Sequence, residues 1–233
     1  MNSYGENFTG MEIGMTFNLF LSKVFGWMFA ALLVSFGTAY AVSMSPAALS
    51  LIMGNRAGMF VLVAVELGLV FYLSGRILRM TKGQAVTLFM LYAVVNGLTL
   101  SYIFLVYRMG TISVAFVVTA LMFGAMALRG RYTTRDLTGI GNYLFMGLIG
   151  VIVANVINMF VKSANLGMGI TLLTIAIFLG LTARDMQQMK RMYQQAAGND
   201  AMLDNLAVAG ALTIYLDFVN LFLNILRVLG RRD

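Results

Sequence analysis

The residue of this sequence best suited to do chemistry in an apolar environment is Asp217. It stands in the middle of residues 211–226, a run that is otherwise nearly apolar. At helical spacing it shares one face with Gly210, Thr213, Asn220 and Asn224. A helix with one polar stripe and apolar flanks is expected at the centre of a bundle rather than against lipid. The alternative is a buried polar residue that holds helices together, but a carboxylate with two amides exceeds what that role requires.

A second carboxylate, Asp185, closes an earlier apolar stretch. On a helix it shares a face with Thr171, Thr174 and Thr182. The next turn is predicted at Gly198-Asn199-Asp200. If the helix continues almost to that turn, Asp185 lies about 13 residues before it and Asp217 about 18 after it, so their depths differ by under about 10 Å. The two carboxylates can therefore face each other, unless Asp185 is an interfacial charge that pairs with Arg184 or Lys190.

Two facing carboxylates would support three kinds of chemistry. In a low dielectric they repel each other, so at least one tends to hold a proton and the two titrate as a pair. Their oxygens also suit a calcium ion, which makes Asp185 and Asp217 candidate metal ligands. Intramembrane proteolysis by paired aspartates needs a Gly-x-Gly-Asp sequence, and the nearest match, Gly139-Ile140-Gly141-Asn142, ends in an amide. Proteolysis is therefore disfavoured, and we expect no enzyme.

Glu66 and Arg76 are two further ionisable residues within or at the end of an apolar stretch. Such residues are costly in a membrane and usually face the bundle interior or a water-filled cavity. Glu66 would either line a pathway or bond a neighbouring helix. Arg76 lies about 15 Å further along the same stretch, at a depth from which it could reach Asp185. Arg79 could fill the same role. Polar residues of other stretches are expected mainly to pack helices: Tyr92, Asn96, Thr99, Asn155 and Asn158.

Seven apolar stretches must position these residues. Of the 233 residues, 60% are hydrophobic and only 11% are charged, whereas a soluble domain carries about a quarter charged residues. Each stretch approaches the ~20 residues that cross ~30 Å of hydrocarbon. They are residues 19–43, 57–75, 84–106, 111–128, 142–161, 166–184 and 203–227. We therefore expect an all-α polytopic membrane protein, a seven-helix bundle with the C-terminal helix at the core.

The short links between these stretches predict one transmembrane domain, residues 19–233, after a polar cytoplasmic segment, residues 1–18. That segment carries Glu6 and Glu12 and lacks the features of a cleaved signal peptide. Basic residues gather in alternate links: Arg76, Arg79, Lys82, Arg129, Arg131, Arg135, Arg184, Lys190 and Arg191. The positive-inside rule places these links and the N-terminus in the cytoplasm. Arg227, Arg231 and Arg232 would then lie outside after seven full crossings, so the side of the C-terminus stays open.

The amino-acid composition excludes several kinds of site. Histidine and cysteine are both absent, which excludes disulfides, thiolate nucleophiles, serine–histidine catalysis and the usual zinc sites. We expect no resident cofactor. The net charge of +7 is explained by membrane topology rather than by nucleic acid, because no basic patch interleaves with aromatic residues. The expected surroundings are a lipid bilayer.

Five segments carry a resemblance to a known family. The last helix, residues 211–230 with the sequence ALTIYLDFVNLFLNILRVLG, resembles the signature of the Bax inhibitor-one (transmembrane Bax inhibitor motif) family. Four further segments agree in the same order: residues 66–74, 96–101, 132–137 and 180–185. The likeness extends from about residue 20 to the end of the chain.

This resemblance implies a fold in which six helices ring the last one, and a pH-sensitive calcium leak across the bacterial cytoplasmic membrane. The aspartate pair that senses pH in bacterial members carries over to Asp185 and Asp217. The arginine that latches this pair in the closed state best matches Arg76, and a glutamate on the same helix matches Glu66.

Other members of the family restrain cell death or bind a membrane protease. The alternative function is therefore a non-conducting regulator that binds another membrane protein. On the channel interpretation, calcium is the transported ion and a candidate ligand of the pair. Glu66, Asn220 and Asn224 are then expected along the pathway or at the gate.

Overall fold

The computed structural model describes residues 3–54, 56–196 and 198–230. The side chains of residues 3–16, 51, 53, 56, 57, 200 and 201 lie outside this description, and with them those of Glu6 and Glu12. Arg231 and Arg232 also lie outside the described residues. Helices and turns make up all the regular structure of the part that is described, which confirms the predicted all-α class.

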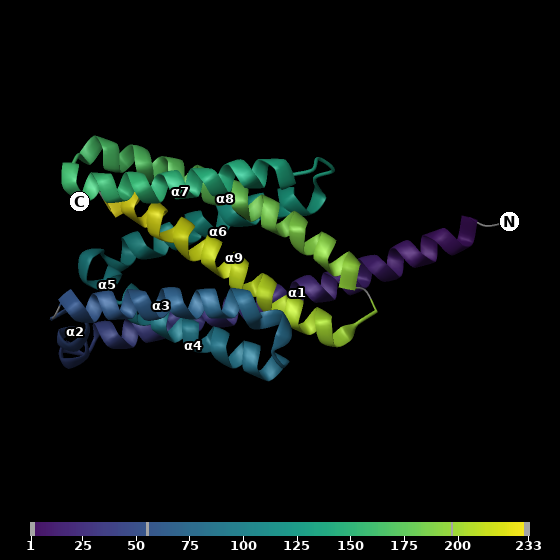
Figure 1. Cartoon of the computed structure of the whole chain (residues 1–233), viewed down its shortest axis with the longest axis horizontal. Coiled ribbons are helices and arrows are strands. Elements are labelled where there is room, and N and C mark those ends of the chain that lie inside the picture. Colours follow the sequence, from purple (N-terminus) through teal and green to yellow (C-terminus); the bar gives the residue numbers. More distant parts are fainter. Residues whose placement is uncertain (1–2, 55, 197, 231–233) are drawn as a thin grey trace. The chain divides into compact units, whose positions relative to one another are not determined.

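The helices follow one another with short connections (Figure 1). In chain order they are α1 (Ser3–Ser43), α2 (Pro46–Met53), α3 (Arg56–Arg76), the 3₁₀ helix η1 (Ile77–Arg79), α4 (Lys82–Leu100), α5 (Ile103–Val106), α6 (Met109–Tyr132), α7 (Thr138–Val161), α8 (Ala164–Ala196) and α9 (Asp200–Leu229).

Seven segments of the described chain are long and apolar enough to cross a membrane, as predicted. They are Phe17–Ser43, Gly58–Arg79, Lys82–Val106, Met109–Tyr132, Thr138–Val161, Ala164–Ala196 and Met202–Leu229. Helix α1 begins at Ser3, well before the predicted residue 19, although its candidate span begins only at Phe17. Among the spans, the largest departure from the predicted bounds is that of α8, which continues to Ala196 instead of ending at residue 184. Its extension buries Met186, Met189, Tyr193 and Ala196. These residues recur at helical spacing between charged and amide side chains, so the extension forms an amphipathic helix. Its mean hydropathy is low because of those polar side chains, and a search for apolar stretches therefore ends before it.

The C-terminal helix α9 forms the core. Of its membrane-spanning window, 72% is buried, against 6% for the windows of α3 and α7. Ala207, Val208, Ala211, Ile214 and Tyr215 are completely buried along it. The fold class is therefore a seven-span helical bundle with the last helix at the core, as the polar stripe on that helix predicted.

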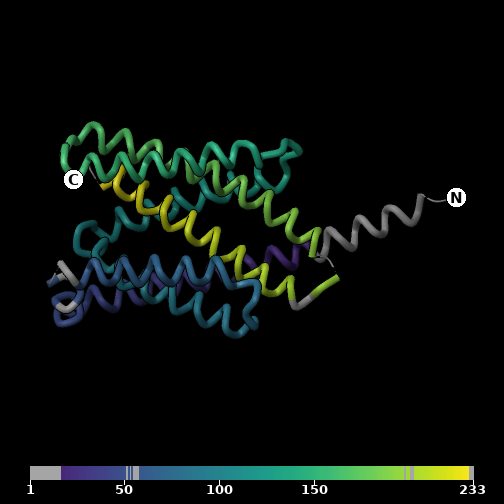
Figure 2. The backbone as a smooth tube through the Cα atoms, viewed as in Figure 1, coloured from purple at the N-terminus to yellow at the C-terminus, as the bar shows by residue number. Residues whose placement is uncertain are grey.

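The chain divides into two compact units. The first runs to Val106 and includes Met192–Leu212. Within it α1 packs on α4, where a Cβ on Gly97 would lie 2.6 Å from the Ser35 carbonyl oxygen. The Ser35 hydroxyl donates to the Ala93 carbonyl at 2.8 Å. Helix α3 passes through η1 into α4 (Figure 2), which begins with a capping box formed by Thr81 and Gln84.

The α8–α9 turn belongs to this first unit and lies where the sequence predicts it. Gly198 has a φ of 93°, a left-handed conformation that glycine adopts without strain. The side chain of Asn199 then caps α9 by accepting a hydrogen bond from the Met202 backbone N–H at 3.0 Å.

The second unit comprises Tyr107–Arg191 and the residues from Thr213 onward. Helices α7 and α8 run side by side in it (Figure 1), with Gly180 against the Leu144 side chain. Helix α6 approaches α8 so closely that a Cβ on Gly130 would lie 2.1 Å from the Ala183 carbonyl oxygen. On α9, the ring of Phe218 makes an edge contact with Phe123 of α6 at 5.5 Å between centroids.

Candidate functional site

Asp217 is buried in the part of α9 that belongs to the second unit. The residue is only 5% exposed, and its chain neighbours Tyr215 and Phe218 are buried as well. Within the described part of the chain, its Oδ2 atom is buried and has no hydrogen-bond partner. A buried carboxylate oxygen without a partner carries a desolvation penalty. A proton or a cation bound to this oxygen would offset its desolvation penalty, so the site favours binding either of them.

Asp185 lies on α8 and is 8% exposed. Its Oδ1 atom is 2.6 Å from Nη1 of Arg184, a short charge-assisted contact. Arg184 is one of the two partners that the sequence allowed for Asp185. The burial of Asp185 shows, however, that the residue is not a freely solvated charge at the membrane edge.

The structure brings Asp185 and Asp217 together. Asp217 interacts electrostatically with Asp185 and with Arg184, and Thr182 lies beside it. The Thr182 hydroxyl donates to the Phe178 carbonyl of its own helix at 2.8 Å. When both acids are ionised, the guanidinium of Arg184 can compensate only one of the two negative charges. The cluster can therefore exchange a proton or attract a second cation.

Asn220 and Asn224 continue the polar stripe of α9 and are half-buried. Their amide nitrogens bond their own helix: Asn220 donates to the Leu216 carbonyl and Asn224 to the Asn220 carbonyl, each at 2.8 Å. The atoms that these side chains can present to a neighbour are consequently their carbonyl oxygens, which are suitable ligands for a hard cation.

The donor set fits calcium only in part. Among the described residues, no group of three or more acidic side chains lies close enough to hold a metal ion. Calcium takes about six to eight oxygens in proteins. Asp185 and Asp217 could supply some of them, so a bound ion would also need water or backbone oxygens.

Glu66 lies in the first unit and is bonded to α4. Its Oε1 atom accepts a hydrogen bond from Asn96, and its Oε2 accepts one from the Thr99 hydroxyl at 3.2 Å. Tyr92, which is buried on the same face of α4, interacts with it electrostatically. The structure therefore shows the helix-bonding role that the sequence allowed for Glu66.

Arg76 ends α3 in the first unit. Its guanidinium carbon lies 5.7 Å from the centroid of the Tyr72 ring, within the range of a cation–π contact. Arg79 follows in η1. A latch would join one of these arginines to the aspartates of the second unit, and this assignment remains a prediction.

Comparison with known proteins identifies the family. The family model described as "Inhibitor of apoptosis-promoting Bax1" matches residues 17–233. The chain belongs to this Bax inhibitor-one family. Inner membrane protein YbhL of Escherichia coli is 44% identical over 214 residues, which cover 91% of this chain and 92% of the relative. An uncharacterized protein of Borreliella burgdorferi is 41% identical, covering 92% and 93% of the two chains. Uncharacterized protein RP147 of Rickettsia prowazekii is 37% identical, covering 100% and 99%.

The family match confirms the resemblance carried by the last helix. Together with the seven candidate spans and the relatives named as membrane proteins, it makes this Bax inhibitor-one member a multi-pass protein of the bacterial inner membrane.

Sequence reasoning missed an ionic cluster in the first unit of this family member. Asp204, near the start of α9, accepts from Lys23 of α1 and from Lys82 of α4, each at 2.9 Å. Its neighbour Asn205 donates to the Met80 carbonyl at 2.7 Å. An acidic residue close to the N-terminus of a helix is expected there without any partner. The sequence therefore offered no signal that α1, α4 and α9 are linked through Asp204.

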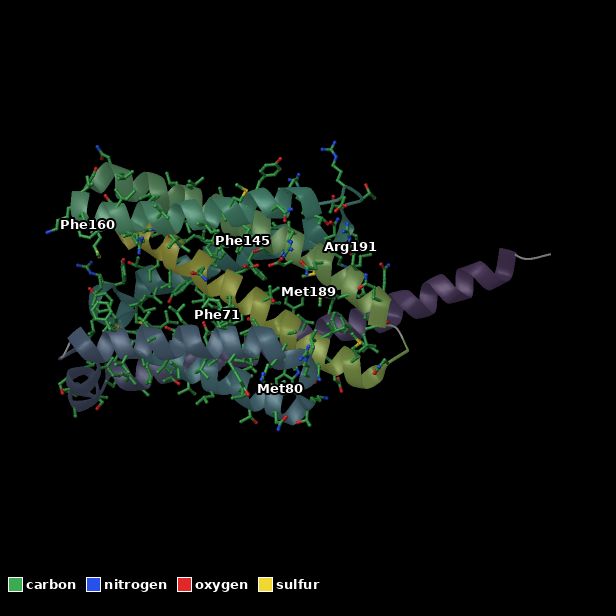
Figure 3. The ribbon with its side chains drawn as sticks, in the orientation of Figure 1. Phe71, Met80, Phe145, Phe160, Met189 and Arg191 are labelled. Atoms are coloured by element: carbon green, nitrogen blue, oxygen red, sulfur yellow. The ribbon has the colours of Figure 1, made fainter. Side chains whose placement is uncertain are left out.

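A second missed cluster holds the α6–α7 loop against α8. Gln187 is buried and uses both ends of its amide: it donates to the Arg135 carbonyl at 2.7 Å and accepts from the Leu137 N–H at 2.8 Å. Arg191, labelled in Figure 3, donates to Asp136 and to the Thr138 hydroxyl, each at 2.7 Å. These bonds begin only two residues after Asp185 and fix the part of α8 that carries it.

Asp136 is the carboxylate of this loop. Hydrogen bonds from the Thr138 side chain and backbone, followed by the one from Arg191, lower the pKa of Asp136 from 3.8 to about 2. It therefore stays ionised throughout the physiological pH range.

Proposed function

We propose that this protein is a pH-sensitive calcium leak channel in which Asp185 and Asp217 form the sensor and Arg76 the latch. The observation that supports this most strongly is the unpartnered Oδ2 atom of the buried Asp217 beside a second buried carboxylate. Ionisable residues at membrane depth mark ion pathways and proton relays more often than they stabilise a fold.

Protonation of the pair is the proposed gating event. When both carboxylates are ionised, Arg184 compensates one charge and the other attracts a cation. In the closed state the latch arginine, Arg76, would provide this second cation. Protonation removes that attraction, so acidification releases the latch and raises calcium flux. Because a ligand shifts an equilibrium only by its differential affinity for the two states, the latch must bind the ionised pair more tightly than the protonated one.

Calcium flux through the purified protein tests this function. Liposomes that contain only this chain are loaded with a calcium indicator, and entry is followed from about pH 6 to about pH 8, the range in which physiological pH switches act. A leak well above that of empty liposomes, rising as the pH falls, supports the channel. Protein that is folded and inserted but gives no flux above empty liposomes would overturn it.

The second candidate is a non-conducting regulator that binds another membrane protein, such as a membrane protease. The observation that favours it is the exposure of two spans, since only 6% of the windows of α3 and of α7 is buried. Such faces can contact lipid or a partner helix. Calcium flux into the same liposomes distinguishes the two functions, because a non-conducting regulator gives no flux.

A further inference from the structure

We infer that Arg184 is a built-in counter-ion of the aspartate pair, and that Gly141 of α7 is the residue that gives its side chain room. No latch is needed for this interaction, because Arg184, Asp185, Asp217 and Gly141 all belong to the second unit. The inference rests on the proposed function only where it predicts flux. The charge arrangement itself can be measured without flux.

Helix geometry alone does not bring the side chains of Arg184 and Asp185 into contact. Neighbouring residues on an α-helix project about 100° apart, so side chains at i and i+1 do not face each other. The 2.6 Å distance between Nη1 of Arg184 and Oδ1 of Asp185 therefore requires the arginine to fold back across the surface of α8. Only about a third of its side chain remains exposed, at 34%.

Gly141 lies against the path that the arginine takes. A Cβ built on Gly141 would lie 2.8 Å from Nε of Arg184, 3.2 Å from its Cγ and 3.3 Å from its Cδ. The alkyl chain and the guanidinium thus rest on bare backbone of α7. The close approach of Arg184 is particular to Gly141, because a Cβ on Gly139 or Gly150 of the same helix would meet nothing within 4 Å.

The charged groups around the pair come from few elements. From α8, Arg184 interacts with both carboxylates, and from α9 comes Asp217 itself. Helix α7 contributes no Asp, Glu, Lys or Arg between Thr138 and Val161. On α6 the cations Arg129 and Arg131 stand in the last turn, where the guanidinium of Arg131 lies 5.2 Å from the Tyr132 ring centroid. Among the described residues, Arg184 is the cation in an ion pair with Asp185, at 2.6 Å, and it also interacts with Asp217.

The consequence is a shift in the pH at which the pair exchanges its proton. A cation in contact with a carboxylate favours the ionised form. Removing Arg184 takes away the cation that contacts Asp185 and interacts with Asp217, so the pair should take up its proton at a higher pH. Displacing the guanidinium with a methyl group on Gly141 should act in the same direction with a smaller effect.

Infrared spectroscopy of the protonated carboxyl band measures this shift in detergent or lipid. The pair's contribution is the part of the pH difference spectrum that Asp217→Asn removes. We expect Arg184→Gln to move the midpoint up by about one pH unit, toward the lower end of the range for a directly contacting charge. Arg184→Lys should keep most of the wild-type midpoint, and Gly141→Ala should move it up. Gly139→Ala, the matched control on the same helix, should not.

Several outcomes would overturn the inference. One is a wild-type midpoint in folded Arg184→Gln, and another is an equal effect of Gly141→Ala and Gly139→Ala. If Arg184→Gln does not fold, Gly141→Ala and its control decide the question alone. The same variants in the flux assay separate this inference from the proposed function. Shifted infrared midpoints without any flux would support Arg184 as the counter-ion and contradict the channel. A pH-dependent flux with unshifted midpoints would support the channel and contradict Arg184 as the counter-ion.

Discussion

Glu66 of α3 accepts a hydrogen bond from Asn96 of α4, so the carboxylate that stands in the middle of one span is satisfied by an amide of the next. Thr99 bonds the other carboxylate oxygen. This arrangement makes Glu66 a link between two helices of the first unit. The second unit differs, because Asp217 has an oxygen that none of the described residues satisfies.

Replacing Asn96 should destabilise the protein. Asn96→Ala leaves a carboxylate oxygen of Glu66 without its partner, and we expect a loss of about 1 kcal/mol, as measured for hydrogen bonds between membrane helices. Unfolding in detergent by heat or denaturant measures it. Asn155→Ala is the control, because the Asn155 amide bonds the Val151 carbonyl of its own helix. Equal losses in the two variants would contradict a link through Glu66.

Close packing of α6 on α8 predicts a second effect. A Cβ on Gly130 would lie 2.1 Å from the Ala183 carbonyl oxygen, which is backbone and cannot move aside alone. Gly130→Ala should therefore lower the unfolding free energy by about 1–3 kcal/mol, the usual range for overpacking. Gly124→Ala on the same helix meets nothing within 4 Å and should be neutral or slightly stabilising. A neutral Gly130→Ala would show that the helices are not in this contact.

These two contacts show how far the sequence predicts the fold. The seven spans follow from hydropathy, and the approach of Asp185 to Asp217 follows from helical rise measured from the Gly198 turn. Hydropathy contains no information on how two helices are rotated against each other. The pairing of Glu66 with Asn96 was therefore not predicted, although Tyr92, Asn96 and Thr99 were placed on one face. The partners of Asp204 are far away in sequence, which explains why that cluster was missed.

The pH dependence of the α6–α7 loop follows from Asp136. Its pKa falls from 3.8 to about 2 in the folded protein, mainly through hydrogen bonds from Thr138. A depressed pKa means that the stabilisation is complete above the unfolded pKa and is lost as the pH falls through the folded one. Asp136→Asn should therefore differ from the wild type above about pH 4 and match it near about pH 2. Amide hydrogen exchange of residues 133–138 measures this. A difference that grows toward low pH would contradict it.

The latch assignment can be tested by comparing two arginines. If Arg76 holds the ionised pair closed, Arg76→Gln should raise calcium flux at neutral pH and flatten its rise on acidification. Arg79→Gln, the neighbouring control in η1, should leave both unchanged. The reverse pattern would assign the latch to Arg79. Two variants that both behave like the wild type would leave the proposed channel without an arginine latch on this helix.

In the proposed mechanism the buried aspartates gate a calcium pathway, and Asp217→Asn tests this gating most directly. This variant keeps the size of the side chain and removes its charge, as permanent protonation would. Calcium entry into protein-only liposomes should become high and nearly independent of pH. An Asp217→Asn protein that is folded and leaks with the unchanged pH dependence of the wild type would contradict the account.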